Sequence, residues 1–291
     1  MFSGSIPALV TPFCDGAFSE KHFRALIDWQ IEQGSSALVP AGTTGEASTL
    51  SNAEHHRVIE VCIEQAAGRV PVIAGCGSND TTNAILHLNF SKKSGAAAGL
   101  VVAPYYNRPN QDGIYQHFHR MTEKNDLPIV LYNVPARTVT DIKPETVAAL
   151  AILPTVIGIK DASGDLSRVT DHRLACPADF CQLSGVDELS LAFNASGGVG
   201  CISVTANVAP KLCAEFQAAC ASGDYELARN LNDTLYPLHL ALFSDASPGP
   251  IKYAMSRVID GFPTELRLPM TPPSEASRKQ VDAALENAGL I

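Results

Sequence analysis

Short apolar runs alternate with longer amphipathic segments along most of the chain, and this alternation limits the possible folds more than any other feature. The runs have the length and composition of buried strands, and the segments between them repeat apolar residues at helical spacing. Eight strands are predicted at residues 5–10, 37–39, 70–74, 99–102, 128–132, 156–160, 180–183 and 198–202. Helices are predicted between them at residues 20–33, 51–67, 81–94, 111–124, 144–153, 188–194 and 208–221.

Strands that alternate with helices over roughly 220 residues predict an α/β fold, and specifically a (β/α)8 TIM barrel. From residue 225 onward only helical patterns remain, at about 225–243, 250–260 and 274–288. We therefore predict a catalytic barrel over residues 1–224 and a C-terminal helical domain over residues 225–291. A doubly wound sheet is the alternative, but the first strand lacks the Gly-x-Gly-x-x-Gly turn of dinucleotide-binding folds.

Charge and composition argue against several classes of partner. The net charge of -9 gives no basic surface for nucleic acid or for an anionic membrane. No apolar run approaches the roughly 20 residues of a membrane span, and the first residues lack the pattern of a signal peptide. The eight cysteines include no Cys-x-x-Cys pair. We therefore expect reduced, buried thiols in a cytoplasmic protein.

In a barrel of this kind, the substrate site forms at the C-terminal ends of the strands. Those ends carry a polar set of residues in this sequence. The set comprises Gly42–Glu46, Pro104–Asn107, Tyr132–Arg137, Lys160-Asp161, Ser184-Gly185 and Ile202-Ser203.

Lys160 ends the strand Val156–Lys160, which is too apolar on both faces for a half-exposed strand. Partial burial disfavours an ammonium ion, and a neutral amine is a nucleophile that forms Schiff bases with carbonyl groups. The alternative is an ordinary lysine at a strand end that reaches water beside Asp161.

Other strand-end residues offer complementary chemistry. The turn Gly42–Gly45 presents hydroxyl and N–H groups before a helix, which can hold a carboxylate, although it can equally be an ordinary capped turn. Tyr132 and Tyr106 can move protons, or they can simply pack at strand ends. Arg137 suits a carboxylate as a bidentate fork, but a single loop arginine is usually solvated.

The histidines predict no metal site. His55 and His56 are adjacent, and His117 and His119 are two apart on a helix and do not share a face. No His-Glu-x-x-His motif is present.

Together these motifs resemble the dihydrodipicolinate synthase / N-acetylneuraminate lyase family of Schiff-base aldolases. The resemblance extends over essentially the whole chain. It rests on Gly4–Pro12, Gly42–Glu46, Pro104–Pro109, Leu131–Arg137, Ile157–Gly164 and Leu266–Met270. It implies a homotetramer built as a dimer of dimers, and a covalent lysine–pyruvate Schiff base without any other cofactor.

The resemblance also implies a role for each site residue. Lys160 would form the Schiff base and Tyr132 would transfer protons beside it. Thr43 and Tyr106 would complete a relay to solvent, with Tyr106 reaching into a neighbouring subunit's site. Substrate binding would fall to Thr43 and Thr44 for the pyruvate carboxylate, Arg137 for the carboxylate of the second substrate, and Gly185 and Ile202 for the pocket lining.

The implied reaction condenses pyruvate with L-aspartate 4-semialdehyde in the diaminopimelate route of L-lysine biosynthesis. Arg137 and the turn Gly42–Gly45 favour this reaction over that of a pyruvate-dependent aldolase for a sugar acid, such as N-acetylneuraminate lyase. A silent regulatory paralogue is the third possibility, and retention of Lys160 and Tyr132 speaks against it.

Finally, the resemblance points to a regulatory site for L-lysine at a subunit interface. The residues concerned are Ala47, Ser48, Asn52, His55, Asn79, Asn83 and Tyr105. Asn83 replaces a glutamate that pairs with the ammonium of lysine in sensitive members, and Asn52 replaces a frequent histidine. Loss of a charge-assisted contact costs roughly 1.5–3 kcal/mol, so we expect weak or absent inhibition by lysine.

Overall fold

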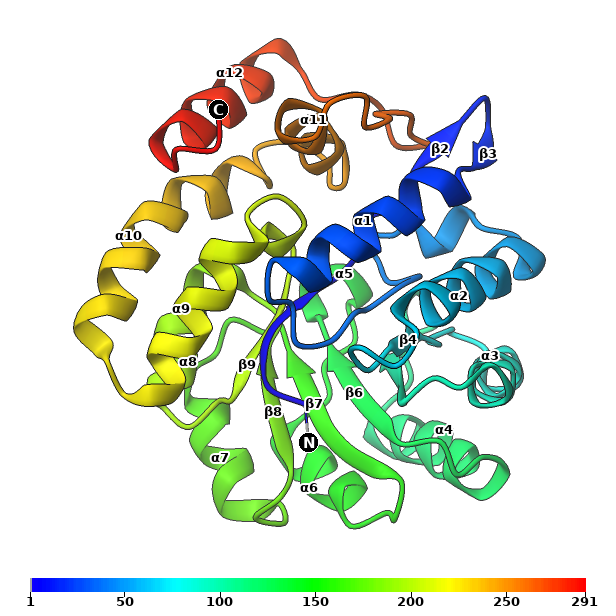
Figure 1. Cartoon of the computed structure of the whole chain (residues 1–291). Helices are drawn as coiled ribbons and strands as arrows, with labels where there is room; N and C mark the ends of the chain where they lie inside the picture. Colours follow the sequence, from blue (N-terminus) through cyan, green and yellow to red (C-terminus); the bar gives the residue numbers. More distant parts are fainter. Residues whose placement is uncertain (1) are drawn as a thin grey trace.

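The computed structural model describes residues 2–291 and forms a barrel of parallel strands enclosed by helices (Figure 1). Its main sheet has seven strands in the order β1-β9-β8-β7-β6-β5-β4. They are β1 (Gly4–Pro7), β4 (Ile73–Gly75), β5 (Ala98–Val102), β6 (Ile129–Asn133), β7 (Val156–Asp161), β8 (Cys181–Ser184) and β9 (Gly200–Ser203).

The segment 37–39 stands between the two edges of this sheet and closes the barrel. Val39 bridges Ala8 just after β1, and Leu38 bridges Val72 just before β4, both in parallel orientation. The segment makes only these isolated bridges, and Pro40 directly after it has no N–H to extend the ladder. The predicted (β/α)8 TIM barrel with a C-terminal helical part is thus confirmed, with its second strand reduced to two bridges.

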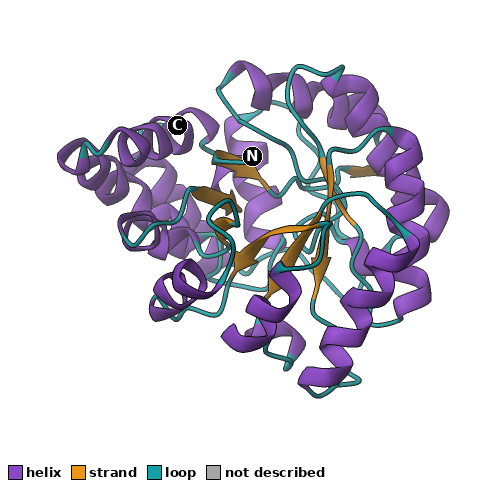
Figure 2. Cartoon of the chain, turned by 90° about the horizontal axis from the view of Figure 1, so that it is seen from below, coloured by secondary structure: helices purple, strands orange, loops and turns teal. Residues whose placement is uncertain are grey.

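Helices surround the strands, as the view from below shows (Figure 2). They are α1 (Glu20–Glu32), α2 (Asn52–Ala66), α3 (Thr81–Ser94), α4 (Gln111–Lys124), α6 (Pro144–Ala151), α7 (Ser167–Ala175), α8 (Ser190–Ala195) and α9 (Pro210–Ser222). Their buried faces pack against the outer sides of the strands, where Phe23, Leu88 and Phe118 are fully buried. A second cluster fills the barrel interior and includes Ile73, Val130 and Ile202.

The sequence analysis did not predict the β2–β3 hairpin or the helices α5 and α7. The hairpin of β2 (Phe13–Cys14) and β3 (Ala17–Phe18) has strands too short to show a period. The four-residue helix α5 (Pro135–Thr138) is also too short for a helical repeat. Helix α7 buries only Val169 and His172, so its sequence carries almost no apolar stripe.

The last part of the chain forms three helices that cover one side of the barrel (Figure 1). They are α10 (Tyr225–Ala241), α11 (Gly249–Val258) and α12 (Glu275–Asn287), and their predicted positions are confirmed within two residues at each end. Helix α10 packs along α9, and α12 packs against α10 and α11. The division into two domains at residues 224 and 225 stays a prediction.

The helices and the cysteines can be compared with what the composition predicts. Within residues 2–291, no helix combines the length and apolarity that crossing a membrane requires. All eight cysteines are free, and six of them are buried, with Cys14 and Cys176 partly exposed. Burial raises the pKa of the Cys76 thiol to about 12, against a smaller lowering by its hydrogen bond with Ser91, and this keeps the thiol protonated and unreactive.

Candidate active site

Lys160 and Tyr132 form the centre of the candidate site, at the C-terminal ends of β7 and β6. The two residues are paired in register, and Lys160 Nζ lies 4.2 Å from the centroid of the Tyr132 ring. Lys160 is 6% exposed and Tyr132 is 7% exposed. This burial excludes the alternative of a lysine that reaches freely into solvent. An amine and a phenol are therefore held together in a place from which most water is removed.

Gly185 makes room for the lysine side chain. A Cβ atom at this position would lie 3.0 Å from Lys160 Cε and 3.1 Å from Lys160 Cγ. The Gly185 N–H donates to the carbonyl of Asp161 at 2.7 Å, which fixes the end of β8 beside the end of β7. Ile202 on β9 is 1% exposed and belongs to the same interior cluster as Tyr132.

The turn Gly42–Gly45 follows the segment that closes the barrel. Its carbonyl at Gly42 accepts from the N–H groups of Gly45 and Ala47, at 3.1 and 3.3 Å. Within residues 2–291, the N–H groups of Thr43 and Thr44 have no acceptor, although Thr44 is only 5% exposed. The turn leads into the three-residue 3-10 segment η1 (Ala47–Thr49) and not directly into α2. The turn therefore does not form the N-terminus of an α-helix, as the sequence suggested. A carboxylate would bind here through the free N–H groups and the hydroxyls of Thr43 and Thr44.

Glu46, directly after this turn, is held by a fully buried ion pair. Lys252 Nζ on α11 lies 2.5 Å from Glu46 Oε1, with the two side chains 0% and 2% exposed. Lys252 also donates to the carbonyl of Glu265 at 2.7 Å, and the N–H of Arg267 donates to Glu46 Oε2 at 3.1 Å. Desolvation lowers the pKa of Lys252. The C-terminal segment thus fixes the turn that carries Thr43 and Thr44.

The sequence analysis missed Lys252. The signal that could have found it is a single charged residue on the buried face of α11, between Ile251 and Ala254. A lysine at such a position almost always has a buried partner.

Two predicted site residues lie at the surface of the single chain. Tyr106 is 90% exposed and has a left-handed backbone, with φ of 72°. Arg137, on α5, is also exposed. The structure therefore brings together Lys160, Tyr132 and Gly185, while Tyr106 and Arg137 are exposed at the surface.

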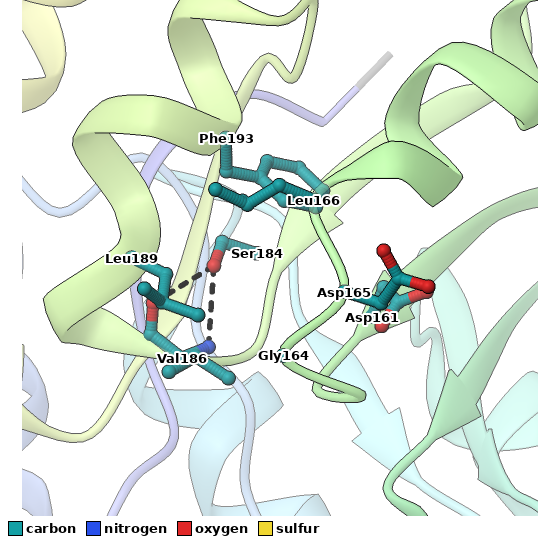
Figure 3. A pocket seen from close by; sticks show the side chains of 8 residues that line it. All are labelled: Asp161, Gly164, Asp165, Leu166, Ser184, Val186, Leu189 and Phe193. Atoms are coloured by element: carbon teal, nitrogen blue, oxygen red, sulfur yellow. Dashed lines mark hydrogen bonds between the residues drawn. The ribbon is translucent and has the colours of Figure 1, made fainter.

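A small pocket lies next to these strand ends, between β7, β8 and the segment leading to α8 (Figure 3). Its lining includes Asp161 and Ser184 but neither Lys160 nor Tyr132. Asp161 Oδ1 accepts from the N–H of Ser163 at 2.7 Å, and the Ser184 hydroxyl exchanges hydrogen bonds with Val186. These polar groups hold the loops after β7 and β8 in shape.

The residues predicted for regulation lie in η1, at the start of α2, just before and in the first turn of α3, and in the loop after β5. His55 is buried, Ala47, Asn79 and Asn83 are partly buried, and Ser48, Asn52 and Tyr105 are exposed. The Asn83 amide is engaged within the chain, at 3.2 Å from His87 Nε2 and 3.4 Å from the Ser78 hydroxyl.

Comparisons with known proteins agree with this architecture. A 4-hydroxy-tetrahydrodipicolinate synthase from Novosphingobium aromaticivorans is 74% identical over 100% of this chain and 99% of that protein. A crystal structure of dihydrodipicolinate synthase from Acinetobacter baumannii, complexed with pyruvate, matches with a TM-score of 0.96 and 43% identity over 100% of both chains. A crystal structure of the Cyanidioschyzon merolae enzyme with lysine bound matches with a TM-score of 0.96 and 36% identity, over 100% of this chain and 99% of that one.

The model of one protein family matches residues 1–288, which is nearly the whole chain. With the barrel, the buried lysine at the end of β7 and the relatives above, this match shows that the chain belongs to the dihydrodipicolinate synthetase family.

Proposed function

We propose that the chain condenses pyruvate with L-aspartate 4-semialdehyde, the reaction of 4-hydroxy-tetrahydrodipicolinate synthases that are 74% and 71% identical to it in sequence. The observation that carries the proposal is the buried amine of Lys160, 4.2 Å from the centre of the Tyr132 ring at the mouth of the barrel. This geometry supports a lyase mechanism that works through a Schiff base on Lys160.

The chemistry follows from these two side chains. The amine of Lys160 attacks the keto carbon of pyruvate, and uptake of one proton with loss of water gives an iminium ion. The iminium withdraws electrons, so the methyl carbon loses a proton and the resulting enamine attacks the aldehyde carbon of the second substrate. Tyr132 is the group beside Lys160 that can accept and return these protons. The iminium formed on Lys160 acts as the electron sink, so the proposed mechanism uses no further cofactor.

The pyruvate carboxylate is assigned to the turn of Thr43 and Thr44. Their two N–H groups have no acceptor within residues 2–291, and N–H groups of this kind bind anions. The buried ion pair behind the turn keeps these donors in place before substrate arrives, so little reorganisation is required.

The choice of aldehyde tests this function directly. Purified protein is supplied with pyruvate and either L-aspartate 4-semialdehyde or N-acetylmannosamine, the aldehyde partner for N-acetylneuraminate formation. We expect turnover with the semialdehyde and none above background with the sugar. The reverse preference would assign the chain to the sugar-acid aldolases, and turnover with neither would support a silent paralogue.

Arg137→Ala is expected to reduce condensation while leaving Schiff-base formation intact. The exposed guanidinium of Arg137 makes the charge-assisted contact proposed for the semialdehyde carboxylate, worth about 1.5–3 kcal/mol or roughly 10- to 100-fold in kcat/KM. Steady-state kinetics with both substrates varied give the measurement. Arg173→Ala, at an exposed position on α7, is the matched control. Unchanged turnover in Arg137→Ala would remove this residue from the substrate assignment.

We also propose the homotetramer, a dimer of dimers in which Tyr106 completes the relay of a neighbouring subunit. The support is the 90% exposure of Tyr106 in the single chain, which leaves a large aromatic side chain for a partner to cover. In this arrangement Thr43, Tyr132 and the partner's tyrosine share one site.

Inhibition by L-lysine is expected to be weak or absent. Asn83 offers no charge to the ammonium of lysine, and its amide already contacts His87 and Ser78. Initial rates at millimolar lysine test this expectation. The variant Asn83→Glu is expected to gain sensitivity because it restores a carboxylate, and Asn89→Glu on the same helix serves as its control. Near-complete inhibition of the unaltered protein at low lysine concentration would contradict this account.

A further inference from the structure

Three histidines from two neighbouring helices meet on the outside of the barrel. His55 and His56 lie on α2, and His87 lies on α3, which packs beside α2 (Figure 1). The rings of His55 and His87 are 4.1 Å apart between centroids, and those of His56 and His87 are 5.3 Å apart. One nitrogen from each ring lies within 4.8 Å of the other two. Spacing along the chain could not indicate this group, because its third member comes from a different helix.

The separations suit a shared metal ion. His87 Nδ1 and His56 Nε2 are 3.3 Å apart. Two imidazole nitrogens bound to one tetrahedral ion at 2.0–2.1 Å are themselves separated by about 3.3 Å. The largest separation, up to 4.8 Å, would close by small side-chain rotations around an ion.

Burial also favours the neutral imidazoles that a metal requires. Burial lowers the pKa of His55 to about 3 and that of His87 to about 4, with a smaller decrease for His56. Each neutral imidazole has one lone pair available for a ligand bond.

Two further observations, one on His55 and one on His87, point to a bound ligand rather than to simple packing of the rings. His55 is 5% exposed, and its Nδ1 has no hydrogen-bond partner within residues 2–291. A backbone contact with Gly75 engages the same ring, as is common for histidines that bind metals. Asn83 lies 3.2 Å from His87 Nε2, where its amide oxygen, after a flip, can accept from Nε2–H. This orientation leaves the Nδ1 lone pair of His87 free for a metal.

A hydrogen bond between His87 and His56 is the competing arrangement, since 3.3 Å also fits an N–H···N contact. It would still leave the buried Nδ1 of His55 without a partner. A buried, unpaired polar atom is unfavourable, and a metal ion satisfies all three nitrogens together.

We propose that His55, His56 and His87 form a binding site for one divalent transition-metal ion of the zinc class. Neutral imidazoles favour Zn²⁺, Ni²⁺, Cu²⁺ and Co²⁺ over the oxygen-seeking Mg²⁺ and Ca²⁺. The fourth coordination position is open to water. The ion links α2 to α3 outside the barrel, away from Lys160, and competes with any ligand that uses His55.

Calorimetric titration of the chelator-treated full-length protein with ZnCl2, and separately with MgCl2, tests the site. We expect one Zn²⁺ per chain, with a Kd on the order of micromolar or tighter, and no response to Mg²⁺. His56→Phe removes one ligand but keeps the aromatic contact with Phe90, whose ring centroid lies 3.7 Å from that of His56. This variant is expected to bind at least about 100-fold more weakly.

Two other variants make the outcome decisive. His119→Ala, at a partly exposed position on α4, should bind Zn²⁺ as the unaltered protein does. His87→Leu provides a second ligand deletion in case His56→Phe does not fold. Co²⁺ should give the visible absorption of a tetrahedral site in the unaltered protein, and either deletion should abolish it. Absence of binding, or Zn²⁺ binding that both deletions leave unchanged, would overturn the proposal. Because the readout is binding, its failure would leave the proposed catalytic function untouched.

Discussion

Lys160→Ala is expected to lower kcat/KM for pyruvate and L-aspartate 4-semialdehyde by about 1,000-fold or more, because removal of a covalent nucleophile costs at least this much. The fold is expected to persist, since the change shortens a side chain inside a barrel that is otherwise intact. Lys211→Ala, at an exposed position on α9, is the matched control and should stay within about twofold of the unaltered protein.

Steady-state kinetics measures the activity of Lys160→Ala, and thermal unfolding shows whether the variant still folds. Loss of turnover with a cooperative unfolding transition near that of the unaltered protein would support the assigned role. A Lys160→Ala protein that folds and retains activity within tenfold would show that another residue carries the covalent step.

Lys252→Met is expected to destabilise the protein by about 3–5 kcal/mol. Methionine replaces most of the volume, but it leaves the carboxylate of Glu46 buried without its partner, and an uncompensated buried charge has a cost of this size. The turn of Thr43 and Thr44 loses its anchor at the same time, so the KM for pyruvate should rise. Denaturant-induced unfolding and pyruvate kinetics provide the two measurements.

The double variant Glu46→Gln with Lys252→Met separates the effect of the unpaired buried charge from the effect of the altered side-chain shape. It removes both charges, so it is expected to recover a substantial part of the stability lost in the single variant. Lys279→Met removes an exposed lysine of a surface ion pair on α12 and should change the unfolding free energy by less than about 1 kcal/mol. If Lys252→Met were as mild as Lys279→Met, the buried pair would have no role in holding the turn.

Local signals predicted much of the fold because they coincide with the tertiary structure. Helices α3 and α4 begin and end where the sequence predicts, since Asp80 and Asn110 cap their N-termini and Gly95 ends α3 in a left-handed conformation. The segment 37–39 was predicted as a strand, but it forms only one bridge to each neighbour where the barrel closes. The number of hydrogen bonds that it makes depends on those neighbours and not on its own sequence. Helix α7 lies over the barrel with few apolar contacts, so no periodicity reveals it.

In the candidate site, too, some residues could be predicted from the sequence and others could not. Lys160, Tyr132 and Gly185 lie at strand ends, and the geometry of a parallel barrel brings strand ends together without further information. The partners of Glu46 and of His55 come from distant helices, and only the folded chain pairs them. The role proposed for Tyr106 requires a neighbouring subunit, because the single chain leaves its side chain exposed.

Borohydride trapping tests the central claim, that Lys160 forms a Schiff base with pyruvate. The protein is incubated with pyruvate, reduced with sodium borohydride, digested and analysed by mass spectrometry, with Lys160→Ala treated in parallel. We predict one reduced pyruvate adduct per chain, located on Lys160 and absent from the variant. An unmodified Lys160 in the trapped protein, or an adduct on another lysine with Lys160 intact, would contradict the account.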